Sequence, residues 1–156
     1  MRGRTLAALV SLLAASTALA QAAAKPAHTK PVITPAADMK WVDMQPGPPG
    51  VKIVDLWGDH TKSAYGALIK FPAGFAAPLH THKSNMKIVV VSGTFIHGAP
   101  GETEARLGPG SYFLQPGDGY KHTTGCDKAS ECIIFAESSG PFTLTMAEAA
   151  AAPAKK

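Results

Sequence analysis

The sequence predicts an all-β domain, built as a two-sheet antiparallel sandwich or barrel. Between residues 41 and 146, short apolar runs alternate with clusters of glycine and proline. Each run has the length of a β-strand, and this rhythm is typical of sandwiches and barrels. No segment of this region has both the length and the 3.6-residue period of an amphipathic helix. No internal repeat is found, so residues 41–146 are interpreted as one domain.

Turn-forming sequences separate the expected strands, because glycine accepts positive φ values and proline fixes φ at a value that tight turns use. These breakers are QPGPPG, FPAG, GAPGE, LGPG and QPGDG. The apolar runs are WVDM, VKIVDLW, YGALIKF, MKIVVV, TFIHG, ARLG, SYFLQ, YKHTT, ECIIFA and FTLTM. The large aromatic residues of the domain are expected in its core, namely Trp41, Trp57, Phe71, Phe113 and Phe135.

The run MKIVVV predicts a strand that is covered on both faces. Alternate residues of a strand point to opposite faces, so Met86, Ile88 and Val90 share one face. Val89 and Val91 lie on the other face, which is therefore also apolar. A strand with two apolar faces is typical of the centre of a two-layer structure.

Both ends of the chain are expected to lie outside the domain. Residues 1–20 contain two arginines, an apolar run and the sequence Ala18-Leu19-Ala20, the pattern of a cleaved secretory signal peptide. The alternative, an uncleaved membrane anchor, is disfavoured because polar residues interrupt the segment. Residues 21–40 and 147–156 are low in complexity and predict a disordered Ala/Pro/Lys linker and a disordered tail. We therefore expect a periplasmic or secreted protein with no membrane anchor after signal cleavage.

The net charge of +4 does not indicate a nucleic-acid partner. Residues 41–146 contain eight Lys/Arg and nine Asp/Glu, so the positive surplus lies in the flanking segments. Nucleic-acid binding requires a clustered basic patch, which this distribution does not provide.

Cys126 and Cys132 are the only cysteines, and exported proteins form and keep disulfides. The segment TTGCDKASEC has the character of a strand end, a polar turn and a strand start. A disulfide across this turn is the first interpretation. The alternative, a redox or metal-binding pair, fits less well because the spacing matches neither C-x-x-C nor a zinc knuckle.

Three histidines predict a metal site. His80 and His82 are one residue apart, so on a strand their imidazoles point to the same face. His122 follows the strand-like run SYFLQ and a second Gly/Pro turn. Imidazole nitrogen is a common ligand of divalent transition metals.

The spacing around the first two histidines resembles the first motif of the cupins, which runs Gly, five residues, His-x-His, three or four residues, Glu, six residues, Gly. Gly74, His80, His82 and Gly93 match this motif. Met86 stands where the cupins have the glutamate. A cupin site here would therefore have three histidines and no carboxylate.

The second cupin motif runs Gly, five residues, Pro-x-Gly, two residues, His. Gly110 and Pro116 match it, and the turn GDG then places Gly119 and His122 one residue later than usual. The resemblance covers residues 41–146 and implies a cupin double-stranded β-helix, a two-sheet antiparallel jelly roll. It is closest to small single-domain cupins, including those related to the ChrR anti-sigma cupin domain and the three-histidine dioxygenases.

This resemblance implies that His80, His82 and His122 bind one divalent transition metal, which would be Fe, Mn, Ni, Cu or Zn. The first functional hypothesis is an exported metal-binding cupin with dioxygenase-like activity on a small chelating substrate. The alternative is a non-catalytic cupin that binds or senses a metal or a small ligand. By analogy with other cupins, a homodimer is expected.

Further residues are candidates for the pocket. Met86 is interpreted as core packing or, alternatively, as a thioether ligand that would favour copper. His97 is either a surface residue or an additional partner of the site. Gln115 and Tyr120 neighbour the second motif and are candidates for hydrogen bonds within the pocket. His60 is expected in a loop.

Overall fold

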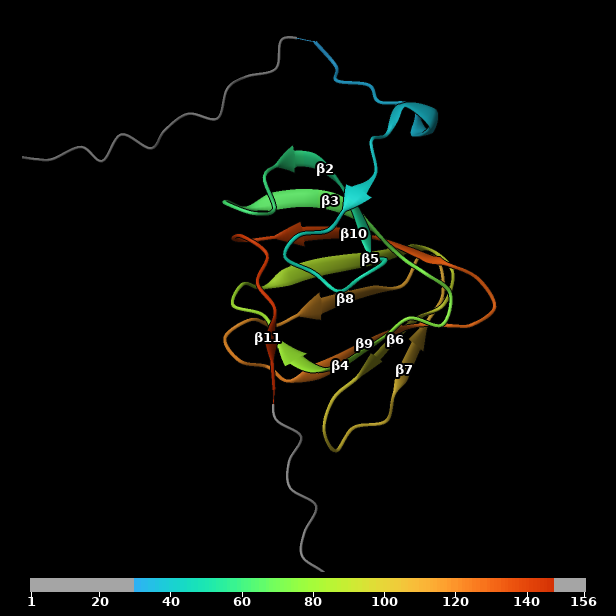
Figure 1. The fold of residues 1–156 in the computed structure, drawn as a ribbon, viewed down its shortest axis with the longest axis vertical. Helices are drawn as coiled ribbons and strands as arrows, with labels where there is room; N and C mark the ends of the chain where they lie inside the picture. Colours follow the sequence, from blue (N-terminus) through green and yellow to red (C-terminus); the bar gives the residue numbers. More distant parts are fainter. Residues whose placement is uncertain (1–29, 148–156) are drawn as a thin grey trace, which may run out of the picture. The chain divides into compact units, whose positions relative to one another are not determined.

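The structure is a computed structural model that describes residues 30–147, and it confirms the all-β prediction (Figure 1). The expected signal peptide lies outside the described residues, as does almost all of the expected tail. The helical element of the described part is the short 3-10 turn η1 (Ala36–Asp38). Within residues 30–147, no helix is long and apolar enough to cross a membrane. The strands are β1 (Val42–Asp43), β2 (Lys52–Gly58), β3 (Tyr65–Phe71), β4 (Ala76–Thr81), β5 (Met86–Ser92), β6 (Phe95–Gly98), β7 (Ala105–Leu107), β8 (Tyr112–Gln115), β9 (His122–Cys126), β10 (Cys132–Ser138) and β11 (Thr145–Met146).

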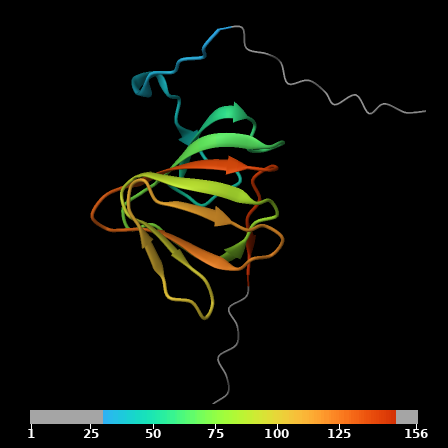
Figure 2. The same ribbon diagram turned by 180° about the vertical axis from the view of Figure 1, so that it is seen from behind.

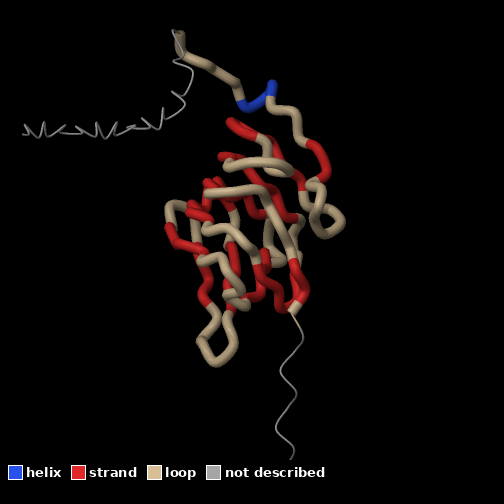
Figure 3. The backbone as a smooth tube through the Cα atoms, turned by 90° about the vertical axis from the view of Figure 1, so that its left-hand side faces the viewer, coloured by secondary structure: helices blue, strands red, loops and turns tan. Residues whose placement is uncertain are grey.

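These strands form two antiparallel sheets, as the sequence predicted. The first sheet has six strands in the order β1-β2-β3-β10-β5-β8, and the second has five in the order β11-β4-β9-β6-β7. Figures 1 and 2 show the two sheets from opposite sides, and Figure 3 shows how strands and connecting loops make up the domain. Many neighbours in these sheets are distant in sequence, so the fold depends on long-range pairing.

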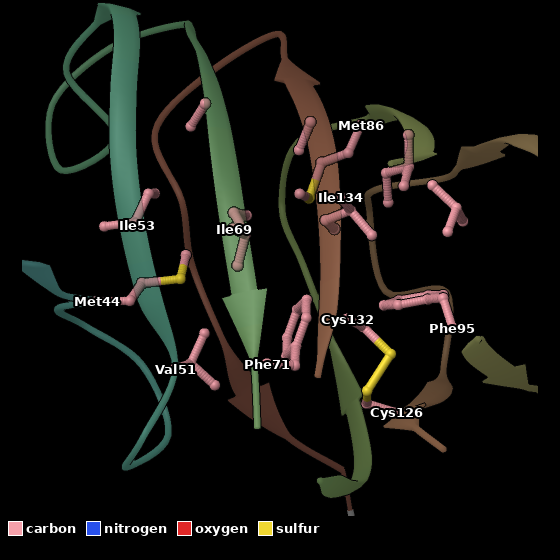
Figure 4. Packing of buried hydrophobic residues seen from close by; sticks show 14 of the residues in the cluster. Met44, Val51, Ile53, Ile69, Phe71, Met86, Phe95, Cys126, Cys132 and Ile134 are labelled. Carbon is pink, nitrogen blue, oxygen red and sulfur yellow. A yellow bond between two sulfur atoms is a disulfide. The ribbon is translucent and has the colours of Figure 1, made fainter. Parts of the chain in front are cut away.

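The hydrophobic core lies between the sheets. Ile69 of β3 and Ile134 of β10 are paired in register and are 2% and 1% exposed. Phe95 of β6 contributes from the second sheet and is also buried. Figure 4 shows these residues with others of the cluster. Alternation along each strand places one set of side chains in this layer, and in β10 every second residue is buried while the residues between are half-buried.

The prediction that β5 is covered on both faces is wrong. Met86, Ile88 and Val90 are buried as expected, but Val89 and Val91 are 36% and 48% exposed. β5 lies between β10 and β8 and is central within its sheet. However, no further layer of the described residues covers the outer face of these two valines, and the sequence pattern alone does not distinguish a central strand from a doubly covered one.

The expectation that Trp57 belongs to the core is also wrong. Its side chain is 46% exposed. Trp57 pairs with Gly66 of β3, and a Cβ atom at Gly66 would lie 2.0 Å from the Trp57 Nε1 atom. The indole therefore packs closely against the backbone at Gly66 while remaining partly open to solvent.

The two faces of β5 give a matched test. We expect Val90→Ala to lower the free energy of unfolding by about 2 kcal/mol, because it removes two buried methyl groups and leaves a cavity. Val91→Ala should change it by less than about 0.5 kcal/mol, since this side chain is half exposed. Urea unfolding of both variants measures the difference. Equal losses at the two positions would show that the outer face is covered in solution.

The expected disulfide between Cys126 and Cys132 is present (Figure 4). It joins the end of β9 to the start of β10, and both residues are buried. The turn is the predicted one, and the bond links the second sheet to the first.

Candidate metal centre

The pairing of β4 with β9 brings the three histidines together. His80 of β4 and His122 of β9 are directly opposite each other in this antiparallel pair. His82 follows the end of β4 and lies two residues from His80, so it projects to the same side. Two segments that are 40 residues apart in the sequence therefore meet because their strands are neighbours in the second sheet.

The imidazole rings of these residues form a compact group. Their centroids are 4.2 Å apart for His80 and His122, 5.0 Å for His80 and His82, and 5.1 Å for His82 and His122. One nitrogen from each ring lies within 4.8 Å of the others. All three residues are buried, at 2%, 9% and 1% exposed. This arrangement fits one metal ion bound by three imidazoles.

Backbone carbonyl groups orient each ring. The Nδ1 atom of His80 lies 2.7 Å from the Pro78 carbonyl oxygen, and that of His82 is hydrogen-bonded to the Thr143 carbonyl. A carbonyl oxygen only accepts, so each Nδ1 carries the proton and donates it. The lone pair of each Nε2 atom is then free. Hydrogen bonds of this kind fix the tautomer of metal-binding histidines and hold the ring in place.

His122 has two polar neighbours at the same nitrogen. Its Nδ1 atom lies 3.2 Å from the Tyr120 carbonyl oxygen and 3.2 Å from Nε2 of Gln115. Metal binding through Nε2 of His122 requires that Nδ1 donates to Tyr120. Gln115 is 2% exposed, and its amide nitrogen donates a hydrogen bond to the Pro116 carbonyl at 3.2 Å.

The electrostatic setting keeps the three imidazoles neutral. Burial lowers the pKa of His80 and of His82 below the ordinary value for histidine. Burial, reinforced by the neighbouring His80, lowers the pKa of His122 to about 3. At pH 7 all three rings are therefore uncharged, which is the form that binds a metal.

The histidines lie at one wall of an apolar pocket between the sheets. Apart from them, the polar residues among the described lining are Gln115 and Thr124, and the remainder are apolar. Met86 lines this pocket and is 5% exposed. It belongs to the core cluster, as its packing interpretation requires, and its thioether also faces the cavity that the histidines face.

The last described segment closes one side of the site, a role that no sequence motif indicated. The Phe142 ring packs on His82 with centroids 5.2 Å apart, and Phe142 and Leu144 both line the pocket. Thr143 provides the carbonyl that holds His82, and its hydroxyl accepts a hydrogen bond from the Lys83 amide at 2.9 Å. The run FTLTM predicted a strand, but a strand pattern does not specify its partner, which is β4.

His97 and Tyr120 lie beside the three histidines rather than among them. The His97 ring is 5.3 Å from that of His122, and the Tyr120 ring is 5.9 Å from it. His97 does not belong to the group whose ligand atoms converge. Burial lowers the pKa of His97, and its Nδ1 atom is buried without a hydrogen-bond partner among the described residues.

A second group of possible ligands, Asp55, Asp59 and His60, is explained by local structure. His60 is a buried turn residue, and its Nδ1 lies 2.8 Å from Asp55 while its Nε2 lies 3.1 Å from the Gln45 carbonyl. Both ring nitrogens are therefore engaged. Asp59 accepts hydrogen bonds from Thr61 and Lys62, so its oxygens are also occupied.

Comparison with protein families places residues 30–156 in the family described as "Domain of unknown function (DUF4437)". The chain belongs to this family. No curated protein matches this DUF4437 chain. Among solved structures, it is similar to an RmlC-like cupin from Shewanella frigidimarina, with 21% identity over 70% of this chain and 92% of that one and a TM-score of 0.54. The resemblance to small cupins is thus confirmed at the level of the fold.

Two further structures reach higher identity with this DUF4437 cupin. KdgF from Halomonas sp. is 25% identical over 67% of this chain and 91% of that one, with a TM-score of 0.52. The structure of SigE in complex with the anti-sigma ChrR from Rhodobacter sphaeroides matches this chain with 25% identity over 67% of its length and a TM-score of 0.51. In that case the match spans 50% of the other chain.

Proposed function

We propose that this DUF4437 cupin is an exported protein that binds one divalent transition metal through His80, His82 and His122. The observation that carries the proposal is the convergence of three buried, neutral imidazoles whose Nδ1 atoms face backbone carbonyls. Such a donor set suits Fe, Mn, Ni, Cu or Zn. Three protein ligands leave open positions for a small molecule, and the pocket next to the histidines provides space for it.

Metal analysis of the folded protein tests this proposal. The full chain is expressed, treated with chelator and then reloaded separately with Fe(II), Mn(II), Ni(II), Cu(II) and Zn(II). We expect about one ion per chain for at least one of these metals, since one group of three histidines is available among residues 30–147. Failure of all five metals to bind stoichiometrically, with the fold intact by circular dichroism, would refute it.

Export is supported by the N-terminal sequence pattern and by the disulfide. A fusion of the full chain to a reporter that folds only outside the cytoplasm should be active. Deletion of residues 2–20 should abolish that activity. Reporter activity that survives this deletion would contradict export by a signal peptide.

For the chemistry, we propose a dioxygenase-like reaction on a small chelating substrate. A bound iron ion would supply the oxygen chemistry, while the histidines hold it and the apolar walls exclude water. The alternative is a non-catalytic sensor, which the likeness to the anti-sigma ChrR structure supports. Oxygen uptake by the iron-loaded protein with diketones, thiols and phenols separates these two, with His80→Ala as the control. If the protein binds metal but takes up no oxygen with any of these compounds, the sensor is favoured.

A further inference from the structure

The described residues that line the pocket provide no charge that could balance a bound metal ion. Among the described residues that line it, none is Asp, Glu, Lys or Arg. The three histidines would bind a metal as neutral ligands, since an imidazole that gives one nitrogen lone pair to a metal and carries its proton on the other nitrogen has no net charge. A divalent ion would therefore keep its full charge of about +2 in a largely apolar surrounding, which is unfavourable unless an anion accompanies it.

The remaining walls are suited to an apolar molecule. Phe95 and Ile134 come from the two sheets, Phe142 and Leu144 come from the last described segment, and all four line the pocket. The cavity volume is about 50 Å³. This space holds only a few water molecules. Polar groups of a ligand that point away from the metal would find few partners there.

Met86 is the residue at which the protein could have supplied the missing charge. It faces Gln115 across the β5–β8 pair, and the Gln115 amide nitrogen is 3.2 Å from Nδ1 of His122. Residue 86 is thus separated from a histidine of the site by a single side chain. Its thioether is uncharged, so the negative charge that balances a bound metal ion must come from a ligand that enters the pocket.

We propose that this site selects a small monoanionic ligand in which an anionic oxygen donor is attached to an apolar body, and that Met86 sets this preference. The anionic oxygen takes an open position on the metal and neutralises part of its charge. The apolar body packs against the aromatic and aliphatic walls. Polyhydroxylated ligands are disfavoured, since their outer hydroxyl groups lose water without gaining hydrogen bonds. This inference rests on the proposed metal site.

The test uses zinc-loaded full-length protein and two hydroxamates, which bind metals as monoanions. Benzohydroxamate carries an apolar ring, and acetohydroxamate has the same donor group with only a methyl group. We expect benzohydroxamate to bind at least about tenfold more tightly by calorimetry, because the ring is buried against the pocket walls. Equal affinities for the two compounds would overturn the apolar part of the proposal without any substitution in the protein.

Two variants test the role of charge. Met86→Glu places a carboxylate in the pocket, so it should raise the affinity for zinc and lower the affinity for benzohydroxamate, each by about tenfold or more. Met86→Gln is the uncharged control of similar size, and it should shift each affinity by much less than Met86→Glu does. Circular dichroism checks that both variants fold.

The outcomes separate this inference from the metal proposal. If Met86→Glu binds zinc more tightly but retains the unmodified affinity for benzohydroxamate, the charge argument is wrong while the metal site stands. If Met86→Gln changes both affinities as strongly as Met86→Glu, the shape of the side chain at residue 86, rather than its charge, sets the affinities, and the inference fails. If the unmodified protein binds no zinc or other metal, the proposed function itself is wrong.

Discussion

His122→Ala is expected to lower the metal affinity of the protein by at least about 100-fold, because it removes one of the three proposed ligands. The two remaining imidazoles, on His80 and His82, leave an incomplete donor set without a carboxylate to compensate. Titration of the chelator-treated protein with zinc, followed by calorimetry, measures the change. His122 is 1% exposed, so the folded state of the variant is checked by urea unfolding.

His97→Ala is the matched control for that experiment. Its ring lies 5.3 Å from that of His122, yet its nitrogens are not among those that converge. The substitution should leave the metal affinity within about threefold of that of the unmodified protein. His97 is not hydrogen-bonded to any of the three proposed ligands, so its loss should not change how they are oriented. A loss as large as that of His122→Ala would mean that the site uses a fourth histidine.

Gly93→Ala is expected to lower the free energy of unfolding by about 2–4 kcal/mol. Gly93 has a φ of 77° in the connection between β5 and β6, which L-residues with a side chain adopt at a cost. A Cβ atom there would also lie 2.4 Å from the Glu131 carbonyl oxygen and 2.9 Å from the Cys132 Cα atom. Because both contacts are to backbone, the clash cannot be relieved by rotating a side chain.

Gly110→Ala separates the cost of the positive φ from the cost of the steric clash with the backbone. Its φ is 84°, almost the same as at Gly93, but a Cβ atom at Gly110 would meet no described atom within 4 Å. We expect a loss of only about 1 kcal/mol, due to the backbone conformation alone. Urea unfolding of the two variants in parallel measures both values. If the two losses are the same, the close approach of β10 to Gly93 does not contribute to stability.

Much of the fold was predictable because its signals are local. The strand β3 corresponds to the run YGALIKF, and the turns at Gly93 and Gly110 have the positive φ values for which glycine is suited. The disulfide was predictable for the same reason, since Cys126 and Cys132 flank one short turn. These features depend on residues that are close in the sequence.

Features that depend on the surroundings of a strand were not predictable in this way. Val89 and Val91 have the same apolar character as Val90, but they face solvent. Trp57 is a large aromatic residue that packs on the outside of its sheet. Periodicity tells which residues share a face, whereas burial depends on whether another layer covers that face.

The candidate site likewise combines features that local sequence predicts with features that depend on tertiary contacts. Strand alternation and the cupin-like spacing are encoded locally, so they were enough to predict two antiparallel sheets and to identify His80, His82 and His122 as the residues to consider. Three features of the site were found only in the folded protein: His80 faces His122 across β4 and β9, the Thr143 carbonyl holds His82, and no charged side chain of the described residues lines the pocket. These features arise from contacts between segments that are far apart in the sequence, and side-chain type alone does not specify such contacts.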